Sequence, residues 1–418
     1  MKFSNFQISS MLPDLYFFNP TCEPAIANGS SFYTAPARLR KLEEDLSCHP
    51  VWLASEKDQV LVTGAVDVPF VNRMLELGFV LPEMVNLRQA FSDSNWLSQP
   101  KGGLRPWGWS PAVGKLFEMV LPSCSEEFRI SAVSSWQEGH RELYSRLTGI
   151  DLLKDILKKY SFSWLSAEFE LALVCHTIEQ IQQEVSRHET AVVKSPWSSS
   201  GRGLLLFPNP DSRKKNEEVL SGMLKQQGFV SVEPWLNKVI DLSYQFYSKN
   251  GIISYKGRTF FETDHKGRYL RNFLADEPVT SGEVSDFLKE HDSRVISLLQ
   301  TALSQSNYAR LYEGWIGVDS MVFRAASGEL KFQPVVEING RYTMGAVALK
   351  LHDKLVEGSK GYFRIYFSAG TSFLKFARKQ EAEKPLVLRD GKIESGFLAL
   401  TPQLETNHFG AYLVAETR

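Results

Sequence analysis

The sequence predicts an α/β protein with a parallel-sheet domain at its N-terminal end and a larger domain of mixed sheets after it. Over the first 124 residues, short apolar runs alternate with stretches of helical spacing, which is typical of a parallel sheet. A second pattern of this kind begins near residue 125. From about residue 229 the apolar runs are joined by hairpin-type dipeptides, which indicate antiparallel strands.

The composition of the chain indicates the general class of protein. The chain has 418 residues, of which 43% are hydrophobic and 23% charged, as expected for a soluble protein of two or three domains. Its formal net charge of -1 gives no support for binding nucleic acid or an acidic membrane. No apolar run approaches the roughly 18 residues of a membrane helix, and no leader-like segment opens the chain. We therefore expect a cytoplasmic protein.

The cysteines favour the same compartment. Their spacing does not suggest a metal site, and a chain of this size does not depend on disulfides. We expect ordinary buried or half-buried thiols at Cys22, Cys48, Cys124 and Cys175.

The first domain is expected to span residues 1–124. In chain order the pattern predicts a strand at 14–20, a loop at 21–36, a helix at 37–46, strands at 49–54 and 58–64, and an irregular inter-domain region at 92–111.

The second domain is expected to span 125–418, with parts at 125–228, 229–350 and 351–418. Its first part should contain a strand at 128–133, helices at 138–150, 165–188 and 213–228, and two strands around the segment from Ala191 to Phe207. In the middle part, hairpin turns are predicted at Asn250-Gly251, Lys266-Gly267 and Ser327-Gly328, with a helix at 281–306. The last part should hold a helix at 346–359, strands near 362–367, 384–388 and 396–401, and a closing hairpin at 403–416.

The segment "AVVKSPWSSSGRGLLLF" places Lys194 at the end of a strand and a small-residue loop directly after it. A lysine ammonium is a compact charge for phosphate oxygens, and small residues let backbone N–H groups approach an anion. The loop residues are Ser198, Ser199, Ser200, Gly201, Arg202 and Gly203. The loop is neither a Walker loop nor a dinucleotide-binding loop, and a plain hairpin connection is the alternative.

The strand "VVEINGR" supplies a second signal. Glu337 and Asn339 are two residues apart, so their side chains project to one face. If the Ser327-Gly328 turn pairs this strand with the preceding one, Asp319 lies beside Glu337. Two carboxylates and an amide oxygen suit magnesium. The alternative is a solvated sheet face, but the apolar neighbours indicate a half-buried strand.

Taken in order, the motifs "VVKSPWSSSGRG", "SVEPWL", "GVDSMVF" and "VVEINGR" resemble those of the ATP-grasp superfamily over residues 125–350. The segment "FFNPTCEPAIANG" looks like the start of the domain that precedes the ATP-grasp domain in poorly characterised bacterial members. The resemblance implies that Lys194 contacts the α- and β-phosphates of ATP and that the loop 198–203 closes over the β- and γ-phosphates.

The remaining site roles are also implied by the resemblance. The hinge strand Glu233, Pro234, Trp235 and Leu236 would read adenine, and Asp241 would accept the ribose hydroxyls. Mg²⁺, or Mn²⁺ in its place, would be held by Asp319, Glu337 and Asn339. Arg341 would stabilise the transferred phosphoryl group.

Two features depart from the family pattern. The lysine that usually precedes the loop is replaced by an arginine, with Arg141 or Arg146 as the candidates, and we assign Arg141 to cofactor binding. The bulky Trp197 stands where small residues are usual, either as a lid anchor, as a stacking residue or as packing.

The resemblance implies an ATP-dependent ligase that joins a carboxylate to an amine or a thiol through an acyl-phosphate. Arg268 and Arg271 are candidate ligands of the substrate carboxylate. A phosphotransferase on the same scaffold is the first alternative, and a non-catalytic ATP-binding module is the second. The expected partners are small-molecule or peptide carboxylates and amines, with neither nucleic acid nor membrane. A homodimer is compatible with the resemblance.

Overall fold

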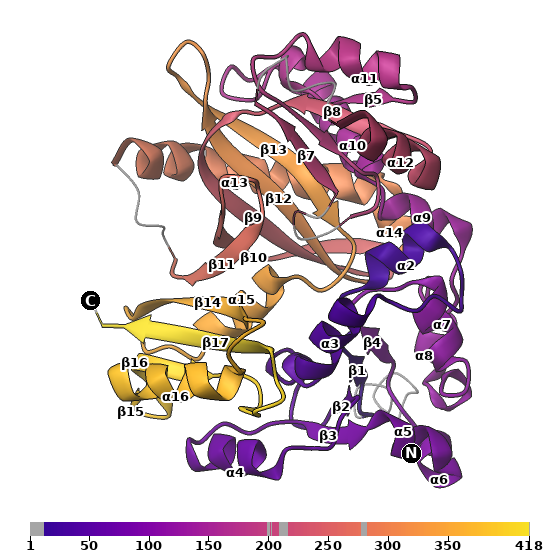
Figure 1. The fold of residues 1–418 in the computed structure, drawn as a ribbon, viewed down its shortest axis with the longest axis vertical. Coiled ribbons are helices and arrows are strands. Elements are labelled where there is room, and N and C mark those ends of the chain that lie inside the picture. Colours follow the sequence, from indigo (N-terminus) through magenta and orange to yellow (C-terminus); the bar gives the residue numbers. More distant parts are fainter. Residues whose placement is uncertain (1–11, 199–200, 202, 209–215, 277–281, 418) are drawn as a thin grey trace, which may run out of the picture.

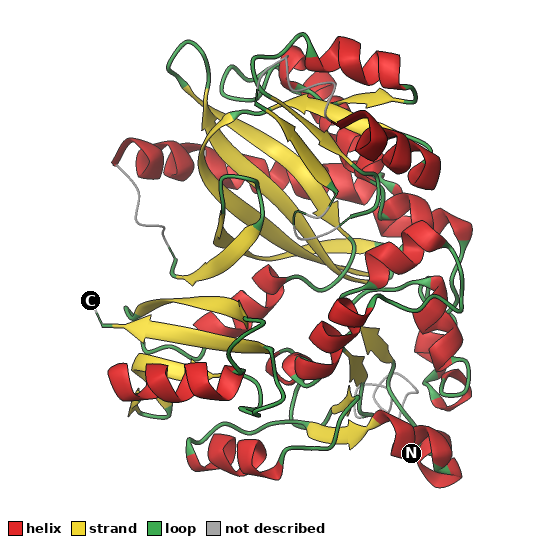
Figure 2. Cartoon of the chain, in the orientation of Figure 1, coloured by secondary structure: helices red, strands yellow, loops and turns green. Residues whose placement is uncertain are grey.

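The computed structural model describes residues 12–198, 201, 203–208, 216–276 and 282–417, and it contains three sheets (Figures 1 and 2). Together they confirm the predicted α/β class. The N-terminal and C-terminal segments lie side by side in the lower half of Figure 1, and the long antiparallel strands fill the upper half.

The first sheet is parallel throughout, as predicted, with the order β3-β2-β1-β4. Its strands are short, so much of the N-terminal region consists of helices and connections. The strands are β1 (Leu15–Phe17), β2 (Gln59–Val62), β3 (Glu83–Asn86) and β4 (Leu104–Pro106). The helices around them are α2 (Cys22–Asn28), α3 (Ala37–Asp45), η1 (His49–Trp52), α4 (Val68–Glu76), α5 (Leu87–Ser92), α6 (Ser94–Ser98), α7 (Pro111–Phe117), η2 (Leu121–Ser123) and α8 (Glu126–Arg129).

The second sheet is small and antiparallel, with the order β5-β8-β6-β7. Two helices pack on it with a separate apolar cluster. The elements of this region are α9 (Glu138–Leu143), α10 (Arg146–Lys159), η3 (Glu168–Glu170), β5 (Leu173–Cys175), α11 (Ile178–Val185), β6 (Ala191–Lys194), β7 (Leu204–Phe207), α12 (Glu217–Gln227) and β8 (Val230–Pro234).

The third sheet has nine strands in the order β13-β12-β9-β10-β11-β14-β17-β16-β15. The three predicted hairpin turns are confirmed, because β9 pairs with β10, β10 with β11, and β12 with β13. The strands are β9 (Asn237–Lys249), β10 (Ile252–Thr263), β11 (Tyr269–Leu274), β12 (Gly314–Arg324), β13 (Leu330–Asn339), β14 (Lys360–Phe367), β15 (Val387–Arg389), β16 (Lys392–Ala399) and β17 (Phe409–Glu416). The accompanying helices are α13 (Gly282–Gln305), α14 (Asn307–Leu311), α15 (Met344–His352) and α16 (Phe373–Glu383).

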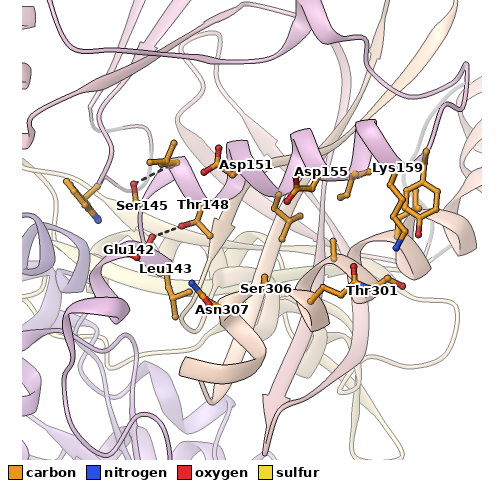
Figure 3. A pocket seen from close by; sticks show the side chains of 18 of the residues that line it. Glu142, Leu143, Ser145, Thr148, Asp151, Asp155, Lys159, Thr301, Ser306 and Asn307 are labelled. Carbon is orange, nitrogen blue, oxygen red and sulfur yellow. Dashed lines mark hydrogen bonds between the residues drawn. The ribbon is translucent and has the colours of Figure 1, made fainter.

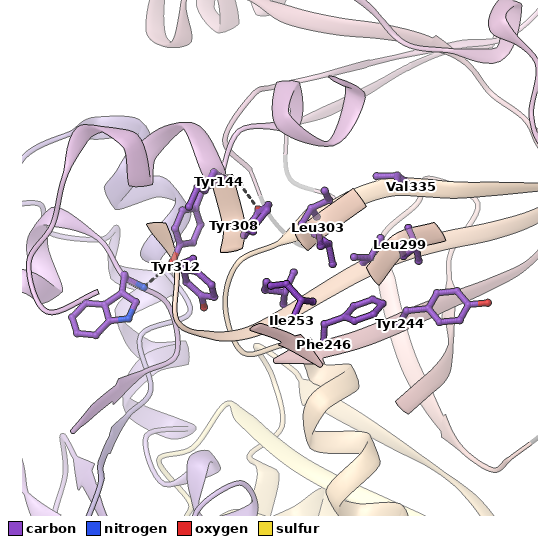
Figure 4. Close-up of a cluster of buried hydrophobic side chains, with 14 of the residues drawn as sticks. Tyr144, Tyr244, Phe246, Ile253, Leu299, Leu303, Tyr308, Tyr312 and Val335 are labelled. Carbon is purple, nitrogen blue, oxygen red and sulfur yellow. Dashed lines mark hydrogen bonds between the residues drawn. The ribbon is translucent and has the colours of Figure 1, made fainter. Parts of the chain in front are cut away.

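One face of the long strands is apolar. Leu242, Tyr244 and Phe246 alternate along β9 and are fully buried with Leu299 of α13. Figure 4 shows this cluster from the side. Because strand residues alternate between faces, the same strand presents a polar row on its other side.

The C-terminal strands share a core with the N-terminal region. Phe363 of β14 and Leu413 of β17 belong to the same apolar cluster as Phe18, Trp52 and Val60. The segment that follows residue 350 therefore extends the large sheet and also covers the parallel sheet.

Two N-terminal predictions were wrong, because a loop was predicted where one short helix lies and a strand where another lies. The expected loop at 21–36 contains α2, which ends at Gly29 with φ 78° and tolerates Pro24 in its first turn. The expected strand at 49–54 contains the 3₁₀ helix η1, with Pro50 in its first turn. In addition, the region 92–111 is less irregular than predicted, since it holds α6 and β4.

Helix caps account for three further errors. Ser125 caps α8, so the predicted strand at 128–133 is wrong. Ser145 caps α10, which divides the predicted helix 138–150 into two. Thr177 caps α11 after strand β5, so the single long helix predicted over 165–188 is also wrong.

The predicted closing hairpin at 403–416 is wrong as well. Only β17 is a strand there, and it pairs with β14 and β16 instead of with the residues just before it. The four cysteines are free and buried, as predicted. Among the described helices, none combines the length and apolar character that crossing a membrane requires.

Candidate functional site

The polar face of the large sheet is organised by register across three strands. Asp319 of β12 lies between Ser243 of β9 and Glu337 of β13. Gly317 is directly paired with Asn339 on the same face. Since residues paired across neighbouring strands share a face, the two carboxylates and the amide meet there as predicted.

The carboxyl group of Asp319 is strongly affected by its surroundings. Burial, together with the neighbouring Glu337 carboxylate, raises the pKa of Asp319 to about 7. The Asn339 amide Nδ2 donates to Asp319 Oδ2 at 3.1 Å. Within the described ranges, no three His, Cys, Asp or Glu side chains converge as a metal cluster. The candidate cation site is therefore two carboxylates and one amide.

This donor set fits a hard divalent cation. Magnesium is bound in proteins by one or two carboxylates, with substrate phosphates and water completing its shell. Asp319 and Glu337 provide these carboxylates in register, and a cation between them would offset their mutual repulsion.

Arg341 is fixed at the end of β13 by two partners. Its Nη2 donates to Asn339 Oδ1 at 2.7 Å, and its Nε donates to Glu23 Oε1 at 2.8 Å. The Arg341 and Glu23 side chains are only 14% and 6% exposed. The second carboxylate oxygen of Glu23 is buried and has no hydrogen-bond partner among the described residues. Helix α2 of the N-terminal region thus positions a predicted catalytic residue.

A second network of hydrogen bonds connects the start of α15 to the polar face of the large sheet. Thr343 Oγ1 donates to Gln245 Oε1 at 2.8 Å, and Gln245 Nε2 donates to Ser243 Oγ at 2.8 Å. Gly317 makes room for this network, because a Cβ there would lie 2.7 Å from Thr343 Cγ2. The row is therefore hydrogen-bonded although it is buried.

Lys194 ends β6, as predicted, and its side chain is 8% exposed. It forms an ion pair with Glu233 of β8, so a residue assigned to phosphate and a residue assigned to adenine are partners here. Ser195 N donates to Gly203 O at 2.9 Å and closes the loop. Gly203 has φ 79°, a left-handed conformation that favours glycine.

The loop contacts the turn between β10 and β11. A Cβ on Gly201, which has φ 73°, would lie 2.9 Å from Arg268 Cα. Arg268 is therefore beside the loop. The described contacts of Arg271 are with Glu262, Phe273 and Tyr362, so the structure does not bring it to the site. Ser199, Ser200 and Arg202 lie outside the described residues.

The two candidate arginines occupy different places. Arg146 Nη2 lies 3.1 Å from Glu337 Oε1 and 3.2 Å from Ser198 Oγ, and its Nε donates to Ser195 O at 3.0 Å. Arg141 instead stacks on the Trp197 ring, with its guanidinium carbon 4.3 Å from the ring centroid. Arg146 thus joins the loop to the carboxylates, while Arg141 packs against the root of the loop.

The hinge and ribose candidates lie beyond the loop. The N–H of Trp235 donates to Thr190 O at 2.8 Å and Pro234 has no N–H, so neither of these two hinge residues has a backbone donor to offer a ligand. Burial raises the pKa of Asp241, and the ion pair with Lys238 acts in the opposite direction. Asp241 also accepts a hydrogen bond from Thr263.

Several site residues were missed at the sequence level. Glu23 was placed in a loop, and Ser243, Gln245 and Thr343 were not singled out. The alternation of polar and apolar residues in "DLSYQF" was a usable signal for Ser243 and Gln245. Glu23 carried no such signal, since its partner Arg341 is 318 positions away.

No protein-family model matches the sequence, and no curated protein is significantly similar to it. Solved structures match almost the whole chain. A biotin carboxylase from Campylobacter jejuni in a β,γ-ATP complex has a TM-score of 0.52 and 11% identity, covering 97% of this chain and 87% of its own. The ADP complex of an N5-carboxyaminoimidazole ribonucleotide synthetase has a TM-score of 0.51 and 9% identity, covering 98% and 93%.

An L-amino acid ligase from Bacillus licheniformis has a TM-score of 0.50 and 11% identity, covering 98% of this chain and 94% of its own. All three are ATP-grasp enzymes. The chain therefore has the ATP-grasp fold, which confirms the fold predicted from the motifs.

Proposed function

We propose that the protein is an ATP- and magnesium-dependent ligase that joins a carboxylate to an amine, or less often a thiol, through an acyl-phosphate. The observation that carries the proposal is the position of Arg146. Its guanidinium contacts Ser198 of the loop and Glu337 of the carboxylate pair. The loop proposed to bind phosphate and the carboxylates proposed to bind a cation therefore meet at Arg146. A triphosphate bridging to a metal ion needs this combination.

The residues of the chain would act mainly by positioning and charge. Lys194 and Arg146 would bind phosphate oxygens, and the backbone of the loop would enclose them. Mg²⁺ held by Asp319, Glu337 and Asn339 would supply neutralising charge at the phosphates. Arg341, tied to Asn339, lies beside these ligands, where charge develops on the transferred group.

The reaction would have two displacements. An oxygen of the substrate carboxylate attacks the γ-phosphorus, the bond to the β,γ-bridging oxygen breaks, and ADP leaves. The amine then attacks the acyl carbon, the bond from that carbon to the phosphate oxygen breaks, and the amine loses a proton as phosphate departs. No protein nucleophile takes part in either step.

Hydroxylamine trapping tests this proposal. The protein is incubated with ATP, Mg²⁺, hydroxylamine and pools of carboxylic acids, and both ADP and hydroxamate are measured. A ligase of the proposed type gives hydroxamate and ADP in equal amounts, and Glu337→Gln abolishes both. ADP released with a hydroxyl acceptor but without hydroxamate would support the phosphotransferase alternative and overturn the ligase proposal.

The similarity to the three solved structures concerns the fold. The ligands in their names are ligands of those proteins. Biotin carboxylase and L-amino acid ligase differ in what they join, so the fold alone does not select a substrate. The buried ion pair between Glu23 and Arg341 supports a substrate site that includes α2.

A further inference from the structure

A cavity of about 600 Å³ lies on the helix-covered side of the large sheet, away from the polar face. Helices α9 and α10 form one wall, and α13 and α14 form the other (Figure 3). Trp197 and Phe229 reach it from the region of the small sheet. Its volume is within the range of small-molecule sites in proteins.

The wall of the cavity has an apolar part and a charged part. The apolar lining is made by Leu143, Leu147, Leu152, Ile156, Leu298 and Ala302. Glu142, Asp151 and Asp155 line it as well, and Lys159 is the one cationic side chain among the described lining residues. Asp151 and Asp155 are one helical turn apart on α10, so they lie on the same side of that helix, where both line the cavity and remain exposed to solvent.

We propose that this cavity binds a small organic ammonium ion with an apolar body. The net charge of the described lining is negative, which favours a cation, and the apolar walls favour a hydrocarbon group over a hydrated metal ion. Neither Asp151 nor Asp155 forms an ion pair within the described part of the chain, so both carboxylates are available to a ligand.

The occupant would contact the root of the phosphate loop. Trp197 lines the cavity, and its Nε1 donates to Arg141 O at 2.9 Å. The N–H of Arg146 donates to Pro196 O at 3.0 Å, so the start of α10 and the loop are joined directly beside the cavity. The binding site itself does not depend on the proposed ligase activity.

Phenethylamine and its neutral analogue phenethyl alcohol test the proposal by calorimetry on the full chain. Phenethylamine should bind, and phenethyl alcohol should bind about fivefold more weakly because it lacks the charge. The double variant Asp151→Asn, Asp155→Asn should remove this difference, and both substituted residues are exposed, so the fold should be retained. Hydrogen exchange over residues 143–160 and 298–307 should slow when phenethylamine binds.

Ala302→Trp fills the cavity and should abolish binding of both compounds. Glu337→Ala is the matched control for binding of the amine at the proposed ligase site, and it should leave phenethylamine affinity unchanged. The proposal is overturned if phenethylamine does not bind, if the alcohol binds equally well, or if only Glu337→Ala weakens the amine. A protein that gave no hydroxamate in the trapping experiment could still bind phenethylamine in this cavity, so the two proposals can fail independently.

Discussion

The two faces of strand β9 bury their residues by different means. On one face, Leu242, Tyr244 and Phe246 contact other apolar side chains, and burial itself stabilises the fold. On the other face, Ser243 and Gln245 are equally buried but depend on hydrogen bonds, and the neighbouring carboxylates repel each other. The first face should determine stability and the second should determine ligand binding, which is the stability–function division expected of a binding site.

The largest effect is expected on the apolar face. Phe246→Ala removes a fully buried ring and should lower the free energy of unfolding by about 3–5 kcal/mol. Val239→Ala, at a 38% exposed position of the same strand, is the matched control and should change it by less than about 0.5 kcal/mol. Urea unfolding followed by circular dichroism measures both. Similar losses for the two variants would contradict the comparison.

The polar face should show the reverse behaviour. Asp319→Asn removes one of two repelling carboxylates, so the free energy of unfolding should stay within about 1 kcal/mol of the parent. The magnesium-dependent part of ATP affinity should fall about 100-fold, equivalent to about 2.7 kcal/mol. Calorimetry with and without Mg²⁺ measures this. Unfolding as severe as that of Phe246→Ala would mean that this face is structural.

His49 offers a third case, a buried polar group without polar partners. Both ring nitrogens lack hydrogen bonds among the described residues, and the ring stacks on Phe363 with centroids 5.5 Å apart. Burial lowers the pKa of His49 to about 3. The ordinary pKa of histidine is 6.5, so below that pH the unfolded chain takes up a proton that the folded chain does not. The stability of the fold therefore falls as the pH falls from about 6.5 toward 3.

This effect amounts to about 2 kcal/mol between pH 7 and pH 5. His49→Phe should remove that share of the pH dependence, as measured by urea unfolding at both pH values. His265→Phe, at an exposed position, is the control and should leave the pH dependence unchanged. Identical pH dependence in His49→Phe and the parent would show that the buried imidazole is not the source.

The smallest effect should separate the two candidate arginines. Arg146→Lys loses the planar group that contacts Ser195, Ser198 and Glu337 together, so ATP affinity should fall about tenfold. Arg141→Lys should change it less than about twofold, since Arg141 stacks on Trp197. A larger loss in Arg141→Lys would restore the assignment made from the sequence.

The sequence predicted the parts of the fold that depend on local pattern. Hairpin dipeptides such as Asn250-Gly251 predicted which consecutive long strands pair, and the Ser327-Gly328 turn placed Asp319 opposite Glu337. Alternation with period two then fixed which face these side chains share.

Most of the wrong predictions have one of two causes. Helix caps at Ser125, Ser145 and Thr177 outweighed apolar patterns that extended across them. Contacts between distant segments were also beyond local pattern, as with Glu23 and Arg341 or with β1 and β4. Long-range packing decides these contacts, and a single sequence does not display it.

Magnesium dependence of ATP binding tests the central claim most directly. Calorimetry is performed with and without Mg²⁺ on the parent protein and on the double variant Glu337→Ala, Asn339→Ala. The parent should bind ATP mainly when Mg²⁺ is present, and the double variant should lose that dependence while it remains folded. Absence of ATP binding by the folded parent, or an unchanged magnesium dependence in the double variant, would contradict the nucleotide site.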